Sequence, residues 1–152
     1  MEKQNVHIKN RRATFEFEVI DRMVAGIVLR GSEIKSVRDG KVSMQDAWCL
    51  FKDGELFIRN LHISEYKQAT MWQHEPLRVR KLLLSKKELS KLQAKVKERG
   101  FTIIPLDMFL NERGFAKLTI ALARGKKVYD KRESIKQRDE KRDLERSLRK
   151  YK

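Results

Sequence analysis

The chain has 152 residues, enough for one domain and a tail, and its 36 lysines and arginines outnumber its 21 acids to give a net charge of +15. Such a chain repels itself unless it binds a polyanion, so nucleic acid is the leading partner class. An anionic membrane surface and a merely soluble basic protein are the alternatives. Cys49 is the only cysteine, which excludes an intramolecular disulfide, and its apolar neighbours indicate a core residue rather than a nucleophile. We therefore expect a reducing, cytoplasmic compartment.

The N-terminal residues are polar and basic. They lack the apolar run of a secretory signal, and no stretch of the chain approaches the ~20 apolar residues of a membrane-spanning helix. We predict a flexible basic arm over residues 1–12. From Ala13 onward, Phe15, Phe17 and Val19 alternate with acidic residues, which is the two-residue period of a half-buried strand.

A second strand and a short helix are predicted next. The apolar run over residues 25–29 indicates the strand. Residues 32–38 have room for one or two helical turns, with Ser32 as the N-cap and with Asp39 and Gly40 ending the helix.

The following segment contains a hairpin signal. Asp53 and Gly54 both tolerate positive φ, and they separate the apolar runs 48–51 and 56–58, which predicts two antiparallel strands. Residues 61–72 have no clear period. The basic and then apolar run after them, residues 78–84, predicts another strand.

The clearest helix covers residues 86–99. Ser85 and Glu88 have the spacing of a capping box, and Gly100 provides a C-cap. Leucines and a valine form one apolar stripe, while lysines occupy much of the remaining surface.

Two strands, over residues 101–110 and 115–123, complete the pattern of short strands with one main helix. A closed barrel removes exposed strand edges, and among small barrels the oligonucleotide-binding kind suits a basic chain. The sequence therefore predicts a mainly β protein with some α structure. We expect a small closed β-barrel of oligonucleotide-binding (OB-like) type with flanking helices over residues 13–129.

The remaining residues, 130–152, form a basic tail. It has too few large apolar side chains to offset the entropy of ordering it. It also lacks glycine and proline, and Leu144, Leu148 and Tyr151 lie at helical spacing. We predict a tail that is disordered alone and helical on a partner. A solvated helix extending from the domain is the alternative.

Motifs for catalysis are missing from the sequence. His7, His62 and His74 are far apart, and none lies near a cysteine or a second histidine at zinc-ligand spacing. There is no phosphate-binding loop and no nucleophile elbow. We therefore predict no metal and no cofactor, and an enzyme is the weakest functional class.

Three short segments carry candidate RNA-binding chemistry. Residues 31–36 place hydroxyls, bases and Glu33 on a tight turn. This acid can accept from a base edge or a 2′-hydroxyl, or pair with a neighbouring base on the surface. Residues 78–81 suit an ordinary strand with a basic exposed face. Residues 125–132 surround Tyr129 with bases, which suits stacking on a nucleobase or a solvated charge run.

A set of motifs runs in order through nearly the whole chain. They are Ala25-Gly26-Ile27-Val28-Leu29, Gly31-Ser32-Glu33-Ile34-Lys35-Ser36, Gly54-Glu55-Leu56-Phe57, Arg80-Lys81-Leu82-Leu83-Leu84, Lys117, Gly125-Lys126-Lys127 and Asp130-Lys131-Arg132. Each motif alone is common, but the ordered set resembles the SsrA-binding protein family, also called small protein B.

The resemblance implies a function in bacterial trans-translation. Members of this family bind the tRNA-like domain of transfer-messenger RNA near its elbow. They deliver that RNA to stalled 70S ribosomes for peptide tagging and ribosome rescue. The C-terminal tail becomes helical in the empty mRNA channel and decoding region. Elongation factor Tu is a further candidate partner on the same RNA, no membrane is involved, and a monomer is expected.

Site residues follow from matched positions and from the helical spacing of the tail. The predicted RNA-binding residues are Glu33, Lys35, Ser36, Arg38, Lys126 and Lys127. The predicted ribosome-binding residues of the tail are Tyr129, Asp130, Lys131, Arg132, Leu144 and Leu148. Many relatives carry histidine where this chain has Tyr129, which can stack on a base but cannot become cationic.

A generic binder of single-stranded nucleic acid on the same barrel is the alternative function. It predicts aromatic side chains spread over an exposed strand face. Phe15, Phe17, Phe51 and Phe57 instead occupy expected core positions. A preference for a structured tRNA-like RNA over a single strand of equal length would separate the two functions.

Overall fold

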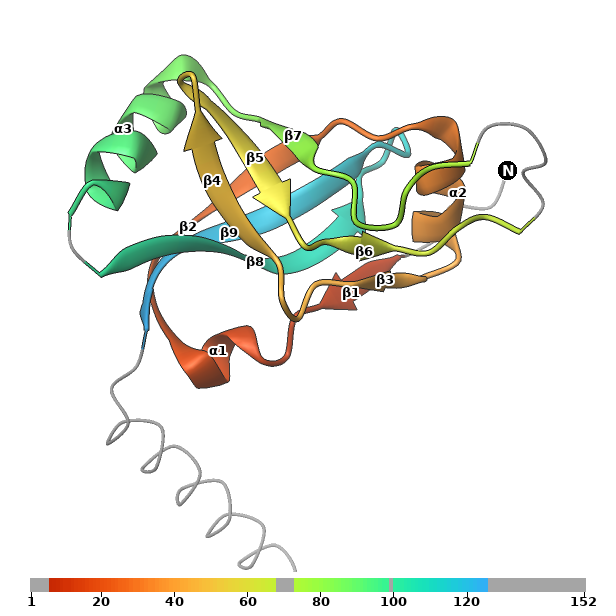
Figure 1. Ribbon diagram of the computed structural model, residues 1–152, viewed down its shortest axis with the longest axis horizontal. Coiled ribbons are helices and arrows are strands. Elements are labelled where there is room, and N and C mark those ends of the chain that lie inside the picture. The colour runs from red at the N-terminus through yellow and green to blue at the C-terminus, as the bar shows by residue number, and fades with distance from the viewer. Residues whose placement is uncertain (1–5, 68–72, 99, 126–152) are drawn as a thin grey trace, which may run out of the picture.

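The computed structural model describes residues 6–67, 73–98 and 100–125, and Figure 1 shows how their elements are arranged. In chain order these elements are β1 (His7–Lys9), α1 (Ala13–Glu16), β2 (Phe17–Ile27), α2 (Gly31–Arg38), β3 (Val42–Ser43), β4 (Trp48–Lys52), β5 (Glu55–Arg59), β6 (His62–Ile63), β7 (Arg80–Leu83), α3 (Lys86–Val96), β8 (Phe101–Leu110) and β9 (Ala116–Gly125).

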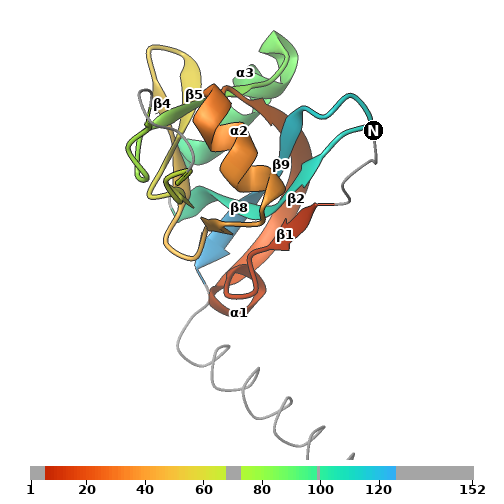
Figure 2. The same ribbon diagram turned by 90° about the vertical axis from the view of Figure 1, so that its right-hand side faces the viewer.

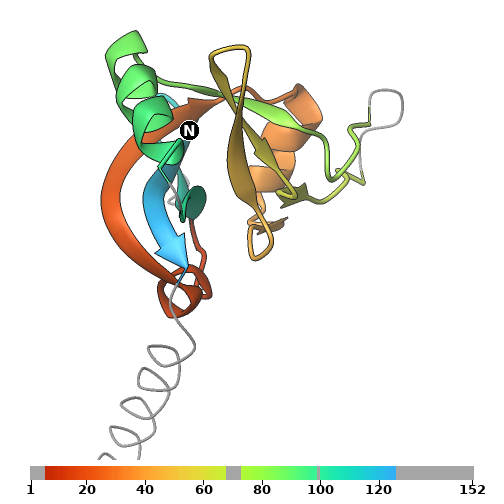
Figure 3. The same cartoon turned by 60° about the vertical axis from the view of Figure 1, so that its left-hand side comes forward.

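The long strands close into a barrel. Hydrogen-bonded neighbours follow the order β1-β8-β4-β5-β7-β2-β9, and β9 also pairs with β8, so each strand of this sheet except β1 belongs to a closed ring. Figure 3 shows β2 and β9 curving side by side around one wall, with the β4–β5 hairpin across from them. The predicted mainly β fold, a small closed barrel of the oligonucleotide-binding type with flanking helices, is confirmed.

β2 is a single long strand, although the sequence predicts two shorter ones. Its pairing with β9 continues from Phe17 to Gly26, and a bulge between Val19 and Asp21 shifts the register. Exposure alternates along the whole strand, but Asp21 occupies a less exposed position while Ile20 and Val24 are exposed, so the hydrophobic pattern of the sequence divides where the strand does not. The residues before it, Ala13–Glu16, form helix α1 rather than the start of a strand.

The predicted flexible arm is corrected for its described part. His7–Lys9 pairs with β8 in antiparallel register. Next to this strand, the buried Asn10 amide donates to the carbonyl oxygens of Met44 at 3.2 Å and Pro105 at 2.9 Å. His7–Lys9 is therefore an added strand on the sheet beside β8, outside the closed ring, while residues 1–5 lie outside the described residues.

Local signals placed the hairpin and the main helix correctly. Asp53 and Gly54 have φ of 54° and 77° at the turn between β4 and β5. In α3 the hydroxyl of Ser85 accepts from the backbone N–H of Glu88 at 3.2 Å, and the Glu88 carboxylate accepts from the Ser85 N–H, also at 3.2 Å. The helix ends at Val96, three residues earlier than the sequence predicts.

The core fills the inside of the barrel with aliphatic side chains. Fully enclosed members come from every wall, including Ala25, Leu56, Ile58, Leu118 and Ile120. Cys49 belongs to the same cluster, which confirms its interpretation as a core residue, and burial raises the pKa of its thiol.

The helices flank the barrel at separate places. Figure 2 shows α2 lying across one end of the barrel, and Figure 1 shows α3 at the opposite end. α1 packs against β8 and β9. There Ala13 belongs to a second small hydrophobic cluster with Ile104, Ala121 and Ala123. In the part of the chain that the structure describes, no helix is both long and apolar enough to span a membrane.

Candidate nucleic-acid interface

Helix α2 begins where the chain leaves the barrel wall after β2. Arg30 is the N-cap residue, with extended φ and ψ of −83° and 164°, and Gly31 is the first helical residue. The predicted cap, Ser32, lies inside the helix instead. The carboxylate of Glu33 accepts from the backbone N–H of Arg30 at 2.9 Å and so satisfies a donor at the start of the helix.

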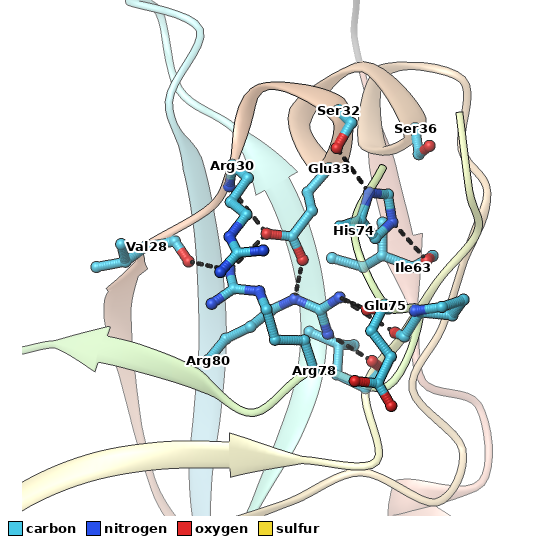
Figure 4. Close-up of polar contacts among 12 residues, drawn as sticks. Val28, Arg30, Ser32, Glu33, Ser36, Ile63, His74, Glu75, Arg78 and Arg80 are labelled. Carbon is cyan, nitrogen blue, oxygen red and sulfur yellow. Dashed lines mark hydrogen bonds and ion pairs between the residues drawn. The ribbon is translucent and has the colours of Figure 1, made fainter. Parts of the chain in front are cut away.

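Glu33 turns its side chain inward, toward two arginines at the start of β7 and just before it, Arg80 and Arg78 (Figure 4). Its Oε1 pairs with Nη2 of Arg78 at 2.5 Å, and its Oε2 pairs with Nε of Arg80. The side chains of Glu33 and Arg80 are fully buried, and that of Arg78 is 24% exposed. This three-residue ion cluster joins α2 to the segment that leads into β7.

Arg80 extends this ion cluster into the loop that precedes β7. Its guanidinium donates to the carbonyl oxygen of Leu61 at 2.7 Å and to that of Pro76 at 3.1 Å. A buried guanidinium keeps its charge and has five N–H donors to satisfy. Through Glu33, the Leu61 carbonyl before β6 and the Pro76 carbonyl after it, Arg80 joins the helix to the chain on both sides of β6.

A buried histidine provides a second link to the same helix. His74 is 2% exposed; one ring nitrogen, Nε2, lies 2.9 Å from the carbonyl oxygen of Ile63, and Nδ1 lies 2.8 Å from the hydroxyl of Ser32. Because a carbonyl can only accept, Nε2 carries a proton and donates. In the neutral ring Nδ1 then accepts from Ser32. Farther along α2, the buried Ser36 hydroxyl donates to the carbonyl oxygen of Ser64 at 2.7 Å.

The charge of the cluster favours an ionised Glu33. Burial of its carboxylate raises its pKa. Hydrogen bonds from Arg78, from the Arg30 backbone and from Arg80 together lower the pKa by more than burial raises it, so the net pKa lies below its ordinary value. One carboxylate and two guanidinium groups leave the cluster with one excess positive charge. The interior beneath α2 is therefore electropositive, not acidic.

The outer face of α2 presents bases. Lys35 and Arg38 are exposed, and the Lys35 ammonium lies 5.4 Å from the centre of the Tyr66 ring. Among the ion pairs between described residues, neither Lys35 nor Arg38 has an acidic partner. The helix thus directs its single acid inward and its bases toward solvent.

The structure brings together some of the predicted RNA-binding residues and separates their roles. Lys35 and Arg38 lie on the exposed face, whereas Glu33 and Ser36 are enclosed and bonded to other parts of the protein. The sequence left open whether Glu33 contacts RNA or pairs with a base, and the geometry favours the pairing, although in the interior and not on the surface. The other predicted site residues, Lys126, Lys127 and the six tail residues, lie outside the described residues.

Several contributors were not predicted from the sequence. The segment with Arg78 and Arg80 was interpreted as a strand with a basic exposed face, yet Arg80 points inward and is fully buried. The two-residue spacing of Arg78 and Arg80 indicates one shared strand face. It cannot reveal their common partner Glu33, which is 45 residues from Arg78 and 47 residues from Arg80 in the sequence. His74 carried no such signal. Within the described ranges, no three His, Cys, Asp or Glu side chains are grouped as a metal site would need.

Comparisons with known proteins agree over most of the chain. The family model described as SmpB protein matches residues 7–150. The SsrA-binding protein of Bacteroides thetaiotaomicron is 54% identical over 146 residues, covering 96% of this chain and 97% of the relative. That of Symbiobacterium thermophilum is 49% identical over 141 residues, covering 93% and 89%.

A solved structure is similar in the same way. It is described as "tmRNA-SmpB: a journey to the center of the bacterial ribosome", and one of its chains superposes with a TM-score of 0.69 at 45% identity, covering 81% of this chain and 86% of that chain. Sequence and fold therefore lead to one assignment, which confirms the resemblance that the ordered motifs carried. The chain belongs to the SmpB family of SsrA-binding proteins.

Proposed function

We propose that this protein binds the tRNA-like domain of transfer-messenger RNA through the exposed face of α2 and takes part in trans-translation, the rescue of stalled bacterial ribosomes. The observation that carries the proposal is that α2 places its acid on its buried face and its bases on its exposed face. Glu33 is buried against Arg78 and Arg80, while Lys35 and Arg38 face solvent. RNA phosphates can approach Lys35 and Arg38 without meeting a carboxylate from within α2, whose single acid is the buried Glu33.

The ion cluster beneath α2 supports recognition of the RNA by its shape, because the cluster holds the helix in place. A folded RNA is recognised mainly through its backbone and its overall form, so the protein must hold its bases at fixed positions. Arg80 through Glu33, and His74 through Ser32, join α2 to the chain around β6. In this proposal Glu33 and Ser36 act as positioning residues, and Lys35 and Arg38 contact the RNA.

The role of the tail is a finer part of the proposal. Residues 130–152 enter the empty mRNA channel of the ribosome and become helical in the decoding region. Asp130, Lys131 and Arg132 make the first contacts there. Support comes from the matched family motif and from the helical spacing of Leu144 and Leu148 in a segment too poor in apolar residues to fold alone.

The proposed function is tested by reconstituted translation of a message without a stop codon. With transfer-messenger RNA charged with alanine, elongation factor Tu and this protein, the stalled peptide should receive the encoded tag and the ribosome should be released. Omission of the protein provides the control. If tagging proceeds equally without it, the proposed function is wrong.

A further inference from the structure

A hollow of about 430 Å³ opens between the start of α2 and the turn that joins β8 to β9. Residues from both elements line it, among them Val28, Arg30, Ile34, Arg38, Arg113 and Phe115. Its volume falls in the range of small-molecule sites, about 300–1,000 Å³. It lies beside the proposed RNA-binding face of α2 and shares Arg38 with that face.

The rim of the hollow carries three exposed arginines. Arg30 precedes α2, Arg38 ends it, and Arg113 stands in the β8–β9 turn. In residues 6–67, 73–98 and 100–125, no ion pair engages any of these guanidinium groups. Three unneutralised charges around one hollow repel each other, and an anion placed between them would relieve that repulsion.

The two sides of the hollow lie near each other at Gly114. Gly114, at φ of 82°, has Nη2 of Arg38 as the neighbour of the position that a Cβ would occupy, at 4.0 Å. The guanidinium at the end of α2 thus lies beside the β8–β9 turn. Both elements must keep this arrangement for the arginines to face one site.

Phe115 provides an aromatic surface at the same edge. Its side chain is 63% exposed, the highest value among the large apolar residues exposed in the described chain. The turn before it is held by Asn111, whose side-chain oxygen accepts from the backbone N–H of Arg113 at 3.0 Å and from that of Phe115 at 2.9 Å. An exposed ring on a hydrogen-bonded turn is available for stacking without first being ordered.

We propose that this hollow binds one unstacked nucleotide of a folded RNA, with the base against Phe115 and the flanking phosphates on Arg30, Arg38 and Arg113. The inference rests on the proposed function and adds a subsite to it. Single-stranded loops display bases that can leave the stack and meet an aromatic side chain. The apolar side chains of Val28 and Ile34 line the space beside the base. An acidic peptide would satisfy the arginines but leave the exposed ring without a partner.

The test compares point variants for binding to a transcribed tRNA-like domain. Phe115→Ala should weaken binding about 5- to 150-fold, the range of one lost base–aromatic stack, without changing the salt dependence. Phe115→Tyr should restore the affinity because the ring is kept. Arg38→Ala and Arg113→Ala should each reduce the slope of log affinity against log salt by about 0.7–0.9, the loss of one phosphate contact.

Arg22→Ala is the matched control. It removes the same charge from β2 at an exposed position about 20 Å from Val28 along the strand. Wild-type affinity for Phe115→Ala, or an equal loss for Arg22→Ala and Arg38→Ala, would overturn the subsite while leaving RNA binding itself intact. An unchanged melting temperature of each variant excludes unfolding as the cause of a lost affinity. Absence of binding by the wild-type protein would overturn the proposed function and the subsite together.

Discussion

Glu33 is the one acid of α2, and its burial determines what the helix presents to RNA. Both of its carboxylate oxygens are engaged by arginines, and Arg80 is fully enclosed with it. Removing one partner of such a cluster leaves the other charge buried without compensation, which costs far more than the net stabilisation of the intact pair. Substitution at this position therefore tests the positioning role.

Glu33→Ala should lower the free energy of unfolding by about 3–5 kcal/mol, the usual cost of leaving a buried charge unpaired. Denaturant unfolding measures this change directly. Lys35→Ala, which removes an exposed charge from the same helix, should leave the stability nearly unchanged and weaken RNA binding. Unchanged stability of Glu33→Ala together with lost RNA affinity would show that Glu33 contacts the RNA itself.

The same residue should give the protein an acid-sensitive stability. Because the pKa of Glu33 in the folded protein lies below the value of 4.5 for a free side chain, its contribution is complete above pH 4.5. The contribution is lost as the pH falls through the lowered folded-state pKa. Unfolding free energies measured from pH 6 downward should therefore fall more steeply for wild type than for Glu33→Gln. Parallel curves would contradict this assignment.

At the scale of elements, the sequence predicted what depends on neighbouring residues. The β4–β5 turn follows from Asp53 and Gly54, and the start of α3 follows from Ser85 and Glu88, because each signal acts within four residues. The β2 bulge and the pairing of His7–Lys9 with β8 depend on partners about a hundred residues away. No local pattern records such contacts.

The capping box of α3 provides a test that is independent of RNA binding. Ser85→Ala should lower the free energy of unfolding by about 1 kcal/mol, since it removes an acceptor for the first turn of the helix. α3 lies at the end of the barrel opposite α2 (Figure 1), so affinity for the tRNA-like domain should not change. A loss of RNA affinity in this variant would place part of the interface on α3.

At the scale of the whole molecule, the ordered motifs predicted the barrel and the family, but only part of the candidate site. Lys35 and Arg38 are predicted RNA-binding residues, and both lie on the surface. The partners of Glu33 and the hollow beside Phe115 were missed, because both are formed by segments that meet only in the folded chain. The composition alone predicted a negatively charged partner, because the chain carries a net charge of +15.

The barrel and the tail should be separable in function. The described barrel ends with β9 at Gly125, and residues 130–152 are too poor in apolar side chains to contribute to its core. Truncation after Tyr129 should leave a folded protein with near-normal affinity for isolated transfer-messenger RNA but without tagging activity. Replacing Asp130, Lys131 and Arg132 together with alanine should give the same result. Normal tagging by the truncated protein would contradict the proposed role of the tail.

The central claim, recognition of a folded tRNA-like RNA by a basic protein surface, is tested most directly by a competition experiment. The affinity of the wild-type protein for the tRNA-like domain is compared with that for an unstructured strand of equal length over a series of salt concentrations. We predict tighter binding of the tRNA-like domain at every salt concentration. Its log affinity should fall linearly with log salt, by about 0.7–0.9 for each phosphate neutralised. Equal or tighter binding of the unstructured strand would contradict the account.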